Sequence, residues 1–157
     1  MVITRYVDLV EPLTNTQIIK AELKGCLVLS KSTEDEVWID AGINTLINLP
    51  DNKDKGWKKI RRVRTRYELL SRANAQSDAL VGKVDPDKNG KATIIGKIQG
   101  IINAMIKEKK LAAGTVTEST TYIADADNCY FDLDIIDKDS AEHIYSFYKF
   151  RFSTNAE

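Results

Sequence analysis

The segment from Trp57 onward repeats apolar residues every three or four positions, and this spacing constrains the fold more than any other feature. Such a period predicts a helix with one buried stripe and basic side chains pointing away from it. The expected stripe consists of Ile60, Val63, Tyr67, Leu70 and Asn74, and the arginines expected to point outward are Arg61, Arg62, Arg66 and Arg72.

A second helical stripe, rich in isoleucine, follows a stretch dense in turn-forming residues. We expect this helix to end near Leu111, before a stop at Ala112-Ala113-Gly114. Gly96 and Gly100 lie one turn apart inside it, and each costs about 1 kcal/mol relative to alanine, which is reasonable if another backbone packs closely there. The stripe consists of Ile94, Ile95, Ile98, Ile101, Ile102 and Met105.

The N-terminal part predicts shorter elements. A β-rich stretch at residues 6–10 predicts a short strand. A capping-box pattern at Thr14 and Gln17 predicts a short helix, which Gly25 is placed to end. Apolar runs at residues 26–29 and 37–39 then flank polar residues and predict a hairpin.

After the second long helix, the sequence predicts strands at residues 116–123, 130–136 and 144–152. In the middle strand, apolar side chains alternate with Asp132 and Asp134, which are expected on an exposed face. The last strand carries aromatic residues on both faces, with Lys149 and Arg151 near its end.

These elements predict an α+β fold: a small, mostly antiparallel sheet packed against two long helices, with extended terminal strands. The length of 157 residues, with 43% hydrophobic and 29% charged content, suits one globular domain with its own core. No repeat, linker or low-complexity tract divides the chain, so residues 1–157 are expected to form a single domain.

The overall charge and the cysteines exclude several classes of protein. Lys+Arg and Asp+Glu number 23 each, so no net charge attracts the chain to nucleic acid or anionic lipid. Cys26 and Cys129 lie in alternating apolar runs and are expected to be reduced core residues, which favours a cytoplasmic origin. No apolar run approaches the roughly 20 residues that span a bilayer, and residues 1–5 lack the order of a signal peptide.

Four short motifs occur in a characteristic order along the chain. They are Ala41-Gly42-Ile43-Asn44-Thr45-Leu46, Ile60-Arg61-Arg62-Val63-Arg64-Thr65, Gly82-Lys83-Val84-Asp85 and Ala141-Glu142-His143-Ile144-Tyr145. Because these motifs occur in the order typical of that family, the sequence resembles the C-terminal domain of contractile phage tail sheath proteins and of phage-tail-like bacteriocins. The resemblance covers residues 6–152. Full sheath proteins are longer and carry further domains ahead of this one, so the chain is expected to be a C-terminal fragment.

The resemblance implies a structural role without catalysis or a cofactor. A sheath subunit polymerises around an inner tail tube and contracts to drive the tube through a cell envelope. The implied partners are other sheath subunits, the inner tube, and baseplate and terminator proteins, with no membrane. The implied location is the bacterial cytoplasm during assembly, and then the phage virion tail or a released tail-like particle.

In this family, extended terminal segments pair with a sheet in adjacent subunits, so the resemblance makes residues 1–12 and 144–157 inter-subunit arms. An aromatic terminal strand left as a bare edge would also be an aggregation hazard, and strand addition would satisfy its backbone. A last strand wholly inside its own domain is the alternative. The implied exchange residues are Tyr6, Val7, Leu9, Val10, Ile144, Tyr145, Phe147, Tyr148, Phe150 and Phe152.

The sequence offers little for metal binding or catalysis. Residues 85–90 copy the opening of an EF-hand calcium loop, but its twelfth place, which should hold a glutamate, is Gly96. We therefore expect a turn capped by Asp or Asn and no metal site. The one histidine, His143, lies beside Glu142 with no serine or cysteine motif to serve, so no catalytic residue is predicted.

Charge is distributed unevenly along the chain, with a basic segment at residues 53–72 and an acidic one at residues 125–142. These can be ordinary solvated faces, or surfaces that complement each other between subunits or meet an acidic tube. A third alternative is a nucleic-acid-binding module with arginines on phosphates, which zero net charge and the lack of a recognition module disfavour. The candidate electrostatic interface comprises Lys58, Lys59, Arg61, Arg62, Arg64, Arg66, Asp132 and Asp134.

Overall fold

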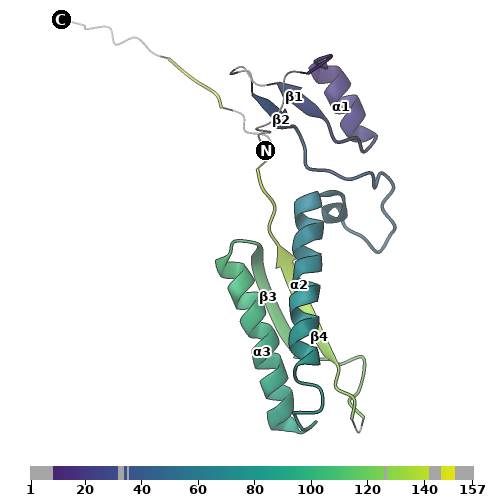
Figure 1. Ribbon diagram of the computed structural model, residues 1–157, viewed down its shortest axis with the longest axis vertical. Coiled ribbons are helices and arrows are strands. Elements are labelled where there is room, and N and C mark those ends of the chain that lie inside the picture. Colours follow the sequence, from purple (N-terminus) through teal and green to yellow (C-terminus); the bar gives the residue numbers. More distant parts are fainter. Residues whose placement is uncertain (1–8, 32–33, 35, 126, 142–145, 151–157) are drawn as a thin grey trace, which may run out of the picture.

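The computed structural model describes residues 9–31, 34, 36–125, 127–141 and 146–150. Figure 1 shows a short helix and a small hairpin at one end of the molecule, with two long helices and a second hairpin at the other. The elements are α1 (Asn15–Leu23), β1 (Leu29–Lys31), β2 (Val37–Ile39), a 3₁₀ turn (Lys55–Lys58), α2 (Ile60–Asp78), α3 (Lys88–Lys107), β3 (Leu111–Glu118) and β4 (Phe131–Asp137). Within the described part of the chain, no helix is both long and apolar enough to cross a membrane.

The N-terminal elements confirm the predicted short helix and a hairpin, but the first strand of the hairpin forms at residues 29–31 rather than 26–29. Thr14 donates its backbone N–H to Gln17 Oε1 at 2.9 Å, which completes the capping box of α1. Gly25 ends the helix with φ +76°, and a Cβ there would lie 3.0 Å from Thr45 Cα, so this position favours glycine twice over. β1 pairs antiparallel with β2.

The C-terminal elements form the main core. The antiparallel β3–β4 hairpin packs on α3, and α2 packs beside α3. From the predicted isoleucine stripe, Ile98, Ile102 and Met105 are buried. Leu111 of β3 lies against this cluster and is 1% exposed. The predicted α+β class, with a small antiparallel sheet on two long helices, is therefore confirmed.

α2 buries a different face from the predicted one. Thr65, Leu69 and Ala73 are its buried residues, whereas Tyr67 and Leu70 of the predicted stripe are 63% and 52% exposed. Both sets of residues repeat with a helical period, so periodicity alone fits either face. The choice depends on contacts that α2 makes with distant elements.

The predicted end of the second long helix is also wrong. α3 ends at Lys107, and Lys109 supplies the left-handed residue, with φ +59°, that reverses the chain. The expected stop at residues 112–114 lies inside β3. Gly114 is needed there for packing, because a Cβ would lie 2.8 Å from side-chain atoms of Ile102 and Ile135.

Two smaller predictions are overturned. A Cβ at Gly96 or Gly100 would meet no described atom within 4 Å, so no backbone of the described chain packs closely there. Cys26 is exposed rather than buried, because β1 begins only at Leu29 and the two-residue alternation of a strand does not reach back to it. Cys129 is half-buried, and both cysteines are free.

Candidate assembly interface

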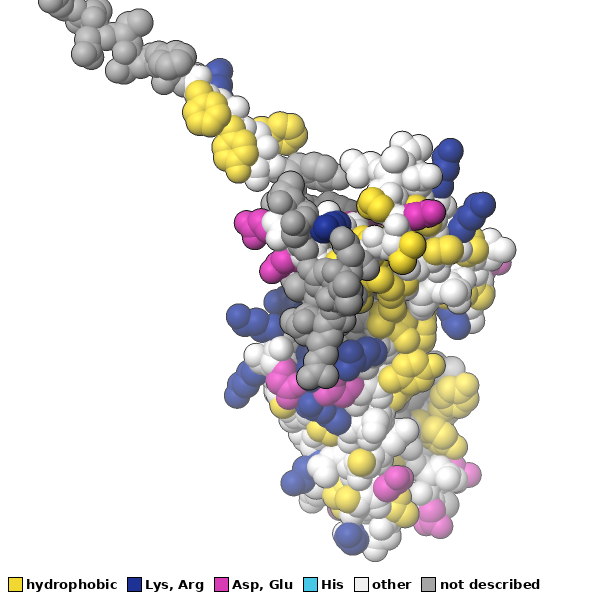
Figure 2. All heavy atoms as spheres, turned by 45° about the horizontal axis from the view of Figure 1, so that its top comes forward, with side chains coloured by type: hydrophobic (Ala, Val, Ile, Leu, Met, Phe, Trp, Pro, Cys, Tyr) yellow, Lys and Arg dark blue, Asp and Glu magenta, His cyan; other side chains and the backbone are white. Residues whose placement is uncertain are grey.

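Among the described residues of the C-terminal region, the segment at residues 146–150 carries the most exposed aromatic side chains. Phe147, Tyr148 and Phe150 are 96%, 79% and 87% exposed, and the segment belongs to no strand. The rings of Tyr148 and Phe150 stack with centroids 6.4 Å apart, as side chains two residues apart do on an extended chain. Figure 2 shows hydrophobic side chains of this segment standing clear of the rest of the molecule.

Only part of the predicted exchange set lies in the described chain. Leu9 and Val10 belong to no strand, and Val10 is 98% exposed. The exchange role of every residue in the set stays a prediction. The predicted exchange residues outside the described chain are Tyr6, Val7, Ile144, Tyr145 and Phe152, and His143 also lies outside it.

An arginine clamp fixes the point where β4 ends and the C-terminal segment begins. Asp137, 7% exposed, accepts hydrogen bonds from Arg62 and, at 2.8 Å, from Arg66 Nε. Arg66 also contacts Asp54 at 3.0 Å and lies over the Trp57 ring, 4.7 Å from its centroid. Burial alone would raise the pKa of Asp137, but the two arginines outweigh it and hold the pKa below its usual 3.8.

Because of this clamp, Arg62 and Arg66 do not point outward as predicted. Their side chains are 23% and 19% exposed and turn toward β4. Of the predicted electrostatic residues, Arg61, Arg64, Asp132 and Asp134 are exposed, while Lys58 and Lys59 are partly buried. Whether these residues meet those of another subunit remains a prediction.

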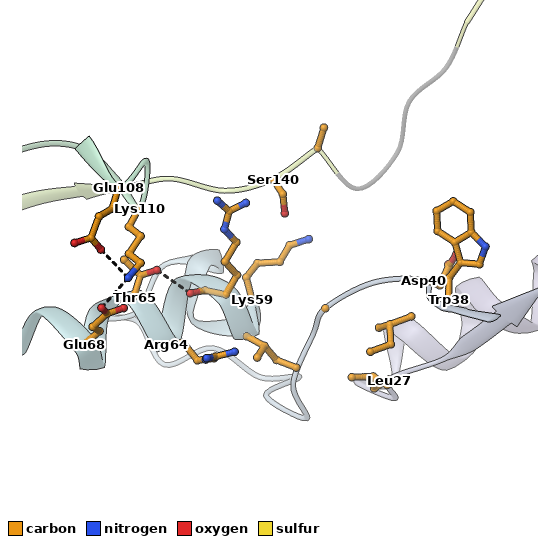
Figure 3. Close-up of a pocket in the computed structure, with 15 residues that line it drawn as sticks. Leu27, Trp38, Asp40, Lys59, Arg64, Thr65, Glu68, Glu108, Lys110 and Ser140 are labelled. Carbon is orange, nitrogen blue, oxygen red and sulfur yellow. Dashed lines mark hydrogen bonds and ion pairs between the residues drawn. The ribbon is translucent and has the colours of Figure 1, made fainter. Parts of the chain in front are cut away.

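A second ionic cluster joins α2 to the turn before β3. Lys110 Nζ lies 2.7 Å from Glu68 Oε1 and 2.8 Å from Glu108 Oε2, and Arg72 Nη1 lies 2.9 Å from Glu108 Oε1. Figure 3 shows Lys110 pointing between the two carboxylates. Hydrogen bonds from Arg72 and Lys110 lower the pKa of Glu108 to about 2. Arg72 is therefore also engaged within its own chain.

A groove of about 760 Å³ separates the N-terminal hairpin from α2. Leu27 and Trp38 lie on its hairpin side, and Arg64 and Glu68 lie on its α2 side (Figure 3). Ser140 lines the same groove. The residues that line it include no histidine or cysteine. Most of its charged side chains, among them Arg64, Glu68 and Lys110, lie across from Leu27 and Trp38.

The calcium-loop-like segment is a capped turn, as predicted. Asp87 is the N-cap of α3, and its carboxylate accepts the N–H of Gly90 at 2.7 Å. A Cβ at Gly90 would lie 1.9 Å from the carbonyl oxygen of Asp85, so the turn folds tightly against the helix. Among the described residues, no group of three or more His, Cys, Asp or Glu side chains could hold a metal ion.

No protein-family model and no curated protein matches the sequence. Solved structures with a similar fold include the sheath tail protein of Listeria innocua, at a TM-score of 0.57 and 15% identity over 83% of this chain and 35% of that one. The sheath tail protein of Desulfitobacterium hafniense matches at a TM-score of 0.60 and 18% identity, over 84% of this chain and 34% of that one. The chain has the fold of part of a tail sheath protein. A chain of the anti-feeding prophage baseplate shares this sheath-like fold, at a TM-score of 0.65 and 12% identity, over 91% of this chain and 41% of that one.

The fold expected from the sequence resemblance is therefore confirmed. The chain spans about a third of the length of the two sheath proteins.

Two residues of this region were not found from the sequence. Gln99 lies among the isoleucines of α3, where its carboxamide bonds to β3. Asp137 lies just beyond the strand predicted at residues 130–136. The sequence offers two arginines spaced four apart, Arg62 and Arg66, as partners for it. The arginine spacing was the one usable signal.

Proposed function

We propose that this chain is the C-terminal, tube-proximal portion of a contractile tail sheath subunit, from a phage tail or a bacteriocin-like particle. It polymerises around an inner tube by strand exchange and contracts to drive the tube through a cell envelope. Its partners are other sheath subunits, the tube, and baseplate and terminator proteins. It assembles in the bacterial cytoplasm, acts in the virion tail or released particle, and catalyses no reaction.

The exposed aromatic segment, on a sheath-like fold, is the observation that carries this proposal. Phe147, Tyr148 and Phe150 are each more than three-quarters exposed. At about 150 Å² or more for each ring, burying them in a partner would supply on the order of 10 kcal/mol before ordering costs. Strand addition buries such rings and pairs the backbone at the same time.

Contraction then follows without ATP. Strand pairing between subunits stays intact as a network of hinges while the rigid bodies slide and rotate around the tube. The energy comes from interfaces that are better buried in the contracted lattice. Exposed Arg61 and Arg64, with exposed Asp132 and Asp134, supply salt-sensitive contacts between copies that hold register during this motion.

Electron microscopy of the purified chain tests the proposal. We expect tubes or rings from residues 1–157 and monomers from a truncation that lacks residues 144–157. Because residues 146–150 contribute no strand to their own body, the truncated body should unfold at the same temperature as the full chain. Normal polymers from the truncation would contradict the proposal.

A variant that keeps all 157 residues separates the effect of losing the aromatic rings from the effect of shortening the chain. Replacing Phe147, Tyr148 and Phe150 together with serine should abolish polymers as completely as the truncation does. Lys149→Ser, within the same segment, serves as the matched control and should still assemble. Equal loss of assembly in both variants would contradict a role for the rings.

A further inference from the structure

The two strands of the main sheet present different outer edges. Ser119 N–H donates to the Tyr130 carbonyl oxygen at 2.9 Å, so the odd-numbered residues at this end of β3 bond toward β4. Because neighbouring residues alternate in direction, Gly114 and Val116 turn their N–H and C=O groups to the outer edge of β3. β3 lies between α3 and β4 in Figure 1, so α3 flanks this edge.

The Gln99 side chain from α3 occupies the centre of that edge. Its Nε2 donates to the Gly114 carbonyl oxygen at 3.0 Å, and its Oε1 accepts the Val116 N–H at 3.2 Å. A carboxamide offers the same donor and acceptor as a peptide group. It therefore bonds to the two groups flanking Thr115 as one residue of an added parallel strand would.

Among the described residues, none covers the outer edge of β4 in this way. By the same alternation, Leu133 and Ile135 direct backbone groups outward, and no described residue hydrogen-bonds to those groups. Leu133 is 38% exposed. A cavity of about 550 Å³ adjoins the start of this strand. Apolar side chains, among them Val84, Ile94 and Phe131, line it together with polar ones that include Asp85, Asp127 and Asn128.

We propose that Gln99 closes the β3 edge to strand addition and that the β4 edge accepts residues 146–150 of a second copy, with one aromatic ring entering the cavity beside Phe131. This inference rests on the proposed function and adds the receiving edge to it. The segment suits that edge because it is already extended and aromatic on both sides. In Figure 1 residues 146–150 lie away from the β3–β4 hairpin of their own chain, which favours a second copy as the occupant.

Photo-cross-linking tests the receiving edge. Chains with p-benzoylphenylalanine in place of Phe150, or of Phe147, are mixed with ¹⁵N-labelled chains, irradiated, and mapped by mass spectrometry. We expect intermolecular cross-links to residues 129–135 or 80–84. Cross-links to residues 113–118, to the groove at Trp38, or only within one chain would overturn the proposal.

Microscopy of the same samples separates two failures. Polymers with cross-links away from the β4 edge would overturn the edge assignment alone. Absence of both polymers and intermolecular cross-links would overturn the proposed function with it.

The role of Gln99 has its own test. Gln99→Ala frees the β3 edge, and since two hydrogen bonds of this kind shift an equilibrium by about one to two powers of ten, cross-links to residues 113–118 should rise about tenfold. Gln76→Ala removes the same side chain from α2 and should leave the cross-link pattern unchanged. Circular dichroism confirms that both variants fold. An unchanged pattern in Gln99→Ala would overturn the closing role of Gln99.

Discussion

At the scale of single residues, Asp137 links segments that lie far apart in the sequence. Its carboxylate accepts hydrogen bonds from Arg62 and Arg66, which lie 75 and 71 positions earlier. Because Asp137 is nearly buried and ends β4, this pairing fixes the direction in which the chain leaves the sheet. Loss of the carboxylate would leave two partly buried arginines without their main partner.

Asp137→Asn should therefore lower the free energy of unfolding at pH 7 by about 2 kcal/mol. Urea titration monitored by circular dichroism measures this. Asp132→Asn, on the same strand but exposed, is the control and should change stability by less than about 0.5 kcal/mol. Equal effects of the two substitutions would argue against the clamp.

The Asp137 contribution should also depend on pH. The folded pKa lies below the usual 3.8, so the stabilisation is fully present above about pH 4 and is lost as the pH falls through the folded pKa. The stability difference between the wild type and Asp137→Asn should therefore shrink in acid. A difference that stays constant from pH 7 to pH 2 would contradict this assignment.

Two glycines of α3 should respond oppositely to alanine. At Gly90 the new Cβ would lie 1.9 Å from the Asp85 carbonyl oxygen, so Gly90→Ala should cost about 2 kcal/mol or more. At Gly96 no described atom lies within 4 Å, so Gly96→Ala should gain about 0.5–1 kcal/mol from helix propensity. Thermal unfolding of both variants measures the two changes in stability. Changes in the same direction would contradict the close contact at Gly90 or the open space at Gly96.

At the scale of elements, α2 presents an apolar stripe on each of two faces. Leu69 is 6% exposed, and its neighbour Leu70 is 52% exposed. The inner stripe packs on α3 and β3, whereas Tyr67 on the outer stripe meets solvent. The rotation of α2 about its axis is therefore set by its tertiary contacts.

Adjacent leucines of α2 test this rotation. Leu69→Ala should destabilise the fold by about 2–5 kcal/mol, because it opens a cavity in the core. Leu70→Ala should cost less than about 1 kcal/mol, because that side chain is half exposed. Chemical denaturation of the two variants measures the difference. A larger loss of stability in Leu70→Ala than in Leu69→Ala would indicate that the face predicted from the sequence is the buried one.

The elements themselves could be predicted from the sequence because their signals are local. The spacing of Ile98, Ile102 and Met105 placed α3, and alternation about Asp132 and Asp134 placed β4. The buried face of α2 could not be predicted, since two stripes fit one period. The end of α3 was missed because a lysine, rather than a glycine, adopts the left-handed conformation there.

The candidate interface was predictable only in part. The aromatic segment could be recognised from its composition, because a row of exposed rings is a hazard in any single chain. Gln99 and Asp137 could not be assigned, because their roles depend on the register of β3 against β4 and on the position of α2 beside that sheet. Such long-range placement leaves no periodic signal in the sequence.

At the scale of the whole molecule, intrachain ion pairs engage part of the basic segment. Arg62, Arg66 and Arg72 all contact carboxylates of their own chain. With no net charge, the chain should not bind duplex DNA even at low salt. Fluorescence anisotropy across a salt series measures this, and tight binding that falls steeply with salt would instead support a nucleic-acid-binding role.

Counting the C-terminal segment alone, a sheet with one receptive edge and one outgoing arm gives each protomer two strand-addition contacts. Copies joined in this way form an unbranched head-to-tail series, which closes into a ring or winds into a helix according to the rotation between neighbours. A second receptive edge would permit branch points and an irregular gel. In the proposed assembly, the Gln99 carboxamide, which bonds to Gly114 and Val116, limits the C-terminal segments to one receiving edge and so favours an ordered tube over a branched network.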